Sequence, residues 1–233
     1  MSPPGNPEFP RAFWIEFFSG PTAAHASVEG FRMPEIAIPT PHIIDRSRPA
    51  RQRTALRSIL RDATAADHAR LDARLGALDL CTVAGYRRFL EINAAAVLPL
   101  EQSLVLAGVR DMLPDWDDRS RTGALLADLV RVRGVPRRLD APDLPDRFAV
   151  LGTLYVLEGS RLGAAYLLRT VRQCSDPIVS SNTAFLGHGA DRQFWPKYLT
   201  VLECHAGELL DEDDLIEPAR RAFDLFAHAA VLS

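Results

Sequence analysis

Residues 146–172 read DRFAVLGTLYVLEGSRLGAAYLLRTVR and contain the most apolar long segment of the chain. The first of these residues, Asp146, follows a proline and is a good N-cap, so the pattern predicts one helix through to the end of the segment. Glu158, Arg161 and Arg169 interrupt the apolar run, and each would be costly at the centre of a bilayer. We therefore expect a buried helix of a folded domain and no membrane span.

Helical periodicity extends over the rest of the chain from about residue 52. Apolar residues recur at three- and four-residue steps, and neither strand-like alternation nor an internal repeat is present. The sequence predicts an all-α, multi-helix bundle of about six helices in a domain over 51–233. Besides the segment above, helices are expected over about 52–76, 82–107, 119–133, 192–210 and 216–230, with a turn at 115–118 and a loop at 175–191.

The first fifty residues differ in composition from the rest. Residues 1–50 hold nine of the 17 prolines, which remove backbone donors and disfavour helix, so we expect a disordered leader. No basic region leads into an apolar one, as a secretory signal would require. The three dispersed cysteines, Cys81, Cys174 and Cys204, match neither a disulfide framework nor a zinc spacing. These features predict a reducing compartment and a cytoplasmic location.

The charge balance argues against a nucleic-acid partner. Lys and Arg total 27, and Asp and Glu total 30, for a formal net charge of −3. A surface built to hold phosphate backbones carries a strong positive excess. We expect a partner or substrate of another chemical class.

Two segments could carry chemistry. On its helix, His68 shares a largely apolar face with Thr64 and Asp72, and Asp72 could orient the imidazole ring. Neutral imidazole is a common iron ligand, although a lone histidine on a helix is more often structural. In the long apolar helix, Gly159 and Gly163 predict either a bend with bare backbone or close packing of another helix.

The two segments together resemble the heme oxygenase family. Arg61-x-Ala63-Thr64-x-x-x-His68-x-x-x-Asp72 is similar to the proximal-helix motif of that family, and residues 155–163 look like the distal-helix motif of the branch associated with bacteriophytochromes. The resemblance covers roughly residues 52–230 and implies a helical, heme-degrading enzyme.

The resemblance also implies roles for particular residues. His68 corresponds to the iron ligand, and the distal residues Gly159, Ser160 and Gly163 lie over the heme. Many members carry aspartate where this chain has Ser160, and a second glycine where it has Ala164. The remaining heme-binding positions implied are Arg61, Thr64, Asp72 and Ala164, with Arg192 or Lys197 as a second propionate contact.

The implied reaction opens heme, which is both cofactor and substrate, to biliverdin, CO and ferrous iron. It uses O2 and electrons from an external reductase or ferredoxin, and a bacteriophytochrome is a candidate recipient of biliverdin. One alternative is a non-catalytic heme carrier or sensor of the same fold. A second is a thiaminase-like hydrolase with Cys204 as nucleophile, and a ferritin-like di-iron protein would need Glu-x-x-His motifs that the chain lacks.

Overall fold

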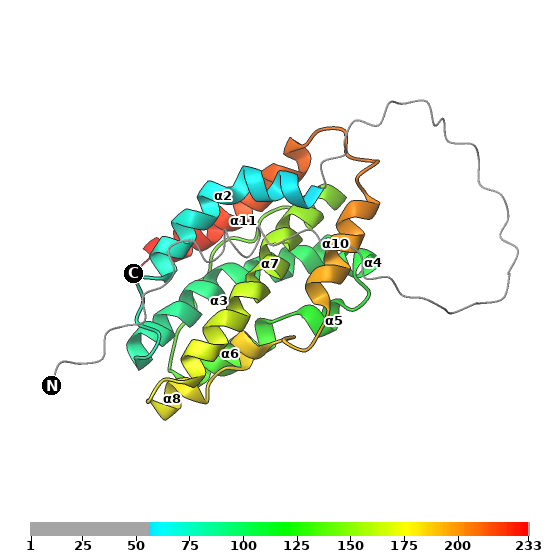
Figure 1. Ribbon diagram of the computed structural model, residues 1–233. Helices are drawn as coiled ribbons and strands as arrows, with labels where there is room; N and C mark the ends of the chain where they lie inside the picture. Colours follow the sequence, from blue (N-terminus) through cyan, green and yellow to red (C-terminus); the bar gives the residue numbers. More distant parts are fainter. Residues whose placement is uncertain (1–55, 233) are drawn as a thin grey trace, which may run out of the picture.

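The computed structural model describes residues 56–232, which form ten helices and no strands (Figure 1). The all-α prediction is confirmed, whereas the predicted leader at 1–50 lies outside the described residues. Six helices are long, namely α2 (Leu56–Leu75), α3 (Val83–Leu106), α6 (Thr122–Arg131), α7 (Arg147–Arg172), α10 (Phe194–Cys204) and α11 (Asp213–Val231). Four are single turns, namely α4 (Val109–Met112), α5 (Trp116–Arg119), α8 (Pro177–Ser180) and α9 (Ala184–Gly187).

The starts of α7 and α3 follow the predicted caps. The Asp146 carboxylate accepts hydrogen bonds from the backbone N–H groups of Phe148 and Ala149, both at 2.9 Å. Thr82 accepts one from the N–H of Gly85 at 3.1 Å. These bonds satisfy donors that the first helical turn leaves unpaired, which is why both boundaries could be read from the sequence.

Three predicted segments differ from the structure. The expected turn at 115–118 contains most of α5, and the expected loop at 175–191 contains α8 and α9. The helix expected over 192–210 is shorter at both ends, since α10 spans Phe194–Cys204. Single-turn helices carry no detectable apolar period, so the loop composition of these segments dominated the prediction.

Helix α7 forms the centre of the bundle, and its first half is buried on all sides. It packs chiefly on α11, and also on α9 and α10, while α3 packs on α6 and α11. Helix α2 lies along α11 and makes a smaller contact with α10 (Figure 1). Helix α2 is therefore anchored to the bundle chiefly through α11.

Helix α3 is the one helix of the described part that is long and apolar enough to cross a membrane. Its most apolar window is 72% buried inside the bundle. Packing against α6 and α11 therefore accounts for its apolar composition.

A glycine sets the approach of α7 to α11. A Cβ atom on Gly152 would lie 2.3 Å from the carbonyl oxygen of Leu215 and 3.2 Å from Cβ of Pro218. We expect Gly152→Ala to lower the free energy of unfolding by about 1–3 kcal/mol, because backbone must shift to admit the methyl group. Urea unfolding of purified protein measures the change.

Gly123 of α6 provides the matched control. A Cβ there would meet nothing within 4 Å. Gly123→Ala should therefore raise stability by about 0.5–1 kcal/mol through helix propensity and loss of chain entropy in the unfolded state. Equal effects of the two substitutions would refute the close approach at Gly152.

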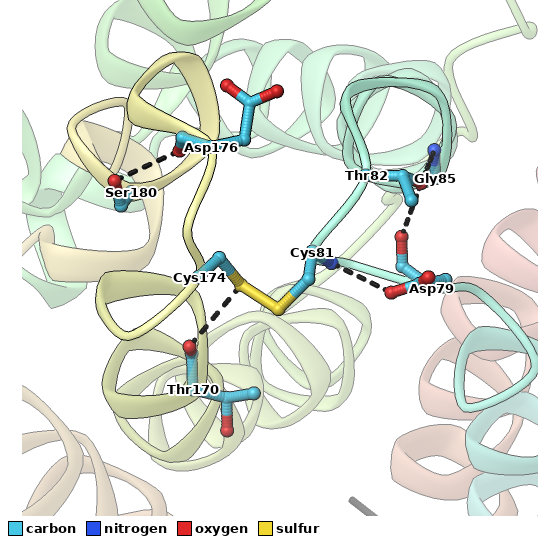
Figure 2. Close-up of a disulfide and its surroundings, with 8 residues drawn as sticks. All are labelled: Asp79, Cys81, Thr82, Gly85, Thr170, Cys174, Asp176 and Ser180. Atoms are coloured by element: carbon cyan, nitrogen blue, oxygen red, sulfur yellow. Dashed lines mark hydrogen bonds between the residues drawn. A yellow bond between two sulfur atoms is a disulfide. The ribbon is translucent and has the colours of Figure 1, made fainter. Parts of the chain in front are cut away.

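A disulfide joins the α2–α3 loop to the end of α7, contrary to the sequence prediction. Cys81 and Cys174 are 93 residues apart in the chain and their Cα atoms are 5.1 Å apart (Figure 2). Cys204 is free and exposed. Spacing along the sequence could not reveal the pair, since it forms only when the loop folds back onto α7. The sequence-based argument for a reducing compartment thus loses one of its grounds.

Candidate functional site

A largely apolar cavity of about 80 Å³ lies between α2, α3, α7, α9 and α11. Helix α2 contributes the imidazole of His68 and the carboxyl group of Asp72, and α11 contributes Phe223 and Phe226. The wall from α7 contains Ser160, Gly163 and Ala164 among apolar neighbours, and Asn93 of α3 and Arg121 of the α5–α6 junction complete the polar lining. The structure thus brings together the two segments singled out in the sequence.

His68 presents a neutral ring to this cavity. Its imidazole lies edge-on to the ring of Phe223, with the ring centroids 4.5 Å apart. Burial lowers the pKa of His68 from 6.5 to about 4, because the charged form would lose hydration inside the protein. At neutral pH the imidazole therefore keeps a lone pair, which metal coordination requires.

Asp72 lines the same cavity one helical turn after His68. Burial raises the pKa of this carboxyl group from 3.8 to about 7. A group at this position can hold a proton in the physiological range. The predicted orienting contact between Asp72 and His68 stays a prediction.

The raised pKa of Asp72 makes the stability of the heme-free protein depend on pH. The folded protein keeps the proton up to about pH 7, while the unfolded chain releases it near pH 4, so stability falls as the pH rises between these values. Asp72→Asn removes this contribution. The full shift corresponds to roughly 4 kcal/mol, but Asp72 is only half-buried and solvent screens it, so we expect wild type to lose on the order of 1 kcal/mol relative to the variant between pH 4 and 8.

Urea unfolding of both proteins at several pH values measures this difference. His68 contributes a slope of the opposite sign between pH 4 and 6.5, because its pKa is lowered, but this contribution is common to both proteins. Asp191→Asn, at an exposed loop position, is the control. A constant difference between wild type and Asp72→Asn would contradict the raised pKa.

Helix α7 forms the opposite part of the wall without a break. It is continuous from Arg147 to Arg172, so the bend predicted at the glycines does not interrupt the helix. Gly163 and Ala164 line the cavity, and Gly159 is buried one turn earlier. The small side chains leave the α7 backbone close to the cavity over this turn.

A polar network lies behind the α7 wall. The Ser160 hydroxyl donates to the carbonyl oxygen of Leu157 at 2.8 Å and accepts from Nη2 of Arg121 at 2.9 Å. The carboxylate of Glu158 is buried and accepts from Nη1 of Arg119 and from Nε of Arg161, both at 3.0 Å. Fixed hydrogen bonds therefore hold the polar side chains of α7 in place behind this wall of the cavity.

Four predicted heme-binding residues do not line the cavity. Arg61 is bonded to Asp62 at 2.8 Å, and Thr64 is buried and donates to the carbonyl oxygen of Leu60 at 2.7 Å. The exposed Arg192 and Lys197 lie 3.8 Å from Asp118 and 3.6 Å from Asp115. The structure thus does not bring the candidate propionate contacts to the cavity that holds His68.

The alternative nucleophile also lies elsewhere. Cys204 ends α10 at an exposed position, and Nδ1 of the adjacent His205 is 2.9 Å from the carbonyl oxygen of Val201. Neither side chain lines the cavity. The arrangement does not support the thiaminase-like alternative.

Sequence reasoning missed several residues of the cavity. Arg121, Asn93 and Phe223 come from elements outside both motifs. No sequence signal placed Phe223 against His68. An arginine at the start of a helix normally indicates a solvated position, so Arg121 carried no signal.

Comparisons with known proteins agree with this architecture. The family model described as heme oxygenase matches residues 117–230, which begin after His68. The heme oxygenase of Xanthomonas campestris pv. campestris (strain 8004) is 32% identical over 136 residues, covering 53% of this chain and 79% of that protein. The crystal structure of the NO- and CO-bound heme oxygenase from Neisseria meningitidis shares the fold, with a TM-score of 0.64 and 21% identity over 76% of this chain and 90% of that one.

Proposed function

Because the chain belongs to the heme oxygenase family, and is thus a heme-degrading enzyme, we propose that heme binds in the cavity between α2 and α7 with His68 as its iron ligand. The observation that carries the assignment is the position of a neutral imidazole on the wall of an apolar cavity, across from the bare turn at Gly163 and Ala164. A flat apolar macrocycle with a metal at its centre needs both features.

The largely apolar lining of the cavity fits heme, but the cavity is smaller than a ligand of that size needs. Ligand sites of this kind enclose roughly 300–1,000 Å³, and the cavity holds about 80 Å³. Helix α2 is held chiefly by α11 and by a smaller contact with α10, and it makes little direct contact with α7. We propose that heme entry separates α2 from α7 and that α2 is the moving element.

The protein groups divide the work around the substrate. Bound heme supplies the iron centre for oxygen chemistry and the ring that is oxidised. His68 would hold the iron through its neutral imidazole ring. The turn at Gly163 and Ala164 limits the space on the other face, and Ser160 with its donors orients polar ligands there.

The electron donor, the recipient of the product and the location are finer proposals. Exposed Arg131, Arg133, Arg137 and Arg138 suit an acidic donor such as a ferredoxin or reductase. We propose biliverdin transfer to a bacteriophytochrome on the likeness of residues 155–163 to that branch. We propose a cytoplasmic location. The oxidation state of Cys81 in cells tests it, because the cytoplasm would keep this cysteine as a free thiol, whereas an oxidising compartment would preserve its disulfide with Cys174.

Turnover with identified products tests the proposal. Hemin is titrated into the purified protein, and the complex is then supplied with O2 and electrons from ferredoxin and its reductase. We expect a Soret band with one-to-one stoichiometry, followed by CO and a bilin identified by chromatography. A stable Soret band without CO or bilin would indicate a heme carrier, and the absence of a Soret band would refute heme binding.

A further inference from the structure

Arg121 is a buried cation on the wall of the cavity. Its side chain lines the cavity, and the residue is 2% exposed. Of its guanidinium nitrogens, Nη2 donates to the carbonyl oxygen of Leu157 at 3.1 Å and to the Ser160 hydroxyl at 2.9 Å. Nε is buried with no hydrogen-bond partner in the described part of the chain. An unmade hydrogen bond on a buried charged group is costly and calls for a ligand or a functional reason.

Within residues 56–232, no carboxylate forms a hydrogen bond or a close ion pair with this guanidinium, although the charges of Glu101 and Glu158 lie near it. The Glu101 carboxylate accepts from the backbone N–H groups of Arg121 and Thr122, and from the Ser120 hydroxyl. Glu158 is bound by Arg119 and Arg161 instead. The charges of both nearby carboxylates favour the charged form of Arg121, but their hydrogen bonds go to other donors, so Nε of Arg121 keeps an unmade hydrogen bond.

The position of Arg121 is fixed by its neighbours. Its guanidinium carbon lies 5.2 Å from the centroid of the Phe185 ring, and its two hydrogen bonds hold it against α7. Burial and the nearby Arg161 lower the pKa of Arg121 to about 10, so the group stays charged at neutral pH. The wall therefore presents a rigid cation rather than a mobile one.

We propose that Arg121 is an anion-binding residue of the heme cavity, which stabilises small anionic ligands on the α7 side of the heme and positions Ser160 beside them. This inference rests on the proposed heme site. The ligand class is a small anion or an oxygen ligand that gains negative charge. A charged donor at this place gives electrostatic stabilisation to a ligand that carries or gains negative charge.

Anion affinity of the ferric heme complex tests the proposal. Fluoride and azide are titrated into the hemin complexes of wild type and Arg121→Gln, with neutral imidazole as the comparison ligand. The glutamine amide keeps a polar donor near the position of Nε but has no charge. We expect the dissociation constants of fluoride and azide to rise by tenfold or more, and that of imidazole to change by less than about twofold.

The control is Arg87→Gln. Arg87 is also partly buried and its Nε donates to the carbonyl oxygen of Val132 at 2.7 Å, but it does not line the cavity. Arg87→Gln should leave the affinities for fluoride, azide and imidazole unchanged. Arg121→Met, which keeps an unbranched side chain but removes the charged group beside Phe185, replaces the glutamine variant if that variant does not fold.

The outcomes separate this inference from the proposed function. A normal Soret band with unchanged fluoride and azide affinities in both Arg121 variants would overturn the role of Arg121 and leave the heme site intact. Parallel weakening of imidazole and the anions would also overturn it, because it would indicate a distorted cavity. A wild-type protein without a Soret band would overturn the heme site itself.

Discussion

His68→Ala is expected to lower heme turnover by about 100-fold or more and to shift the Soret band of the hemin complex. The iron loses its protein ligand, whereas the apolar cavity can still take up the macrocycle. Heme affinity should therefore fall less than turnover. Absorbance titration measures the affinity, and CO release with a ferredoxin system measures turnover.

Imidazole rescue distinguishes ligation from a structural role of His68. Free imidazole in the His68→Ala complex should restore the wild-type Soret position and part of the turnover, since the substitution leaves space at the position of the ring. The control is His228→Ala, which removes an exposed histidine from α11. Full turnover of His68→Ala without added imidazole would rule out His68 as the iron ligand.

Cys174→Ser is expected to lower the free energy of unfolding by about 4 kcal/mol. The disulfide closes a loop whose ends are 93 residues apart, and loss of such a constraint increases the entropy of the unfolded chain. For a domain of this size the unfolding midpoint should fall by on the order of 10 °C. Thermal unfolding followed by circular dichroism measures the shift.

The disulfide also connects the two elements that border the cavity. Cys81 follows α2 by a few residues, and Cys174 follows α7 (Figure 2). Reduction of wild type with a dithiol should reproduce the Cys174→Ser midpoint, while Cys204→Ser should resemble wild type because its thiol is free and exposed. Identical midpoints for oxidised wild type and Cys174→Ser would show that the disulfide contributes no stability.

Local sequence signals predicted the long helices well. Asp146 and Thr82 cap α7 and α3 as expected, because a cap is an interaction within three residues. The same kind of signal marks α8, where the Asp176 carboxylate accepts from the N–H of Ile178 at 2.8 Å and Pro177 occupies the first turn. The prediction of a loop at 175–191 followed the polar composition of the segment and did not use this cap.

The candidate site was predicted in part. His68, Asp72, Ser160, Gly163 and Ala164 lie around one cavity, as the two motifs indicated. The arginines and the lysine expected at the propionates do not lie there, since helix position alone says little about which way a long exposed side chain turns. Their roles at the propionates stay predictions.

Short-range interactions allowed the sequence by itself to determine the helices, their caps and the apolar faces that bury them. The tertiary structure alone decided which distant residues meet. The disulfide between Cys81 and Cys174 and the hydrogen bond from Arg121 to Ser160 can form only after the helices have packed. Contacts between residues far apart in the chain depend on the summed packing of whole helices, which no local pattern encodes.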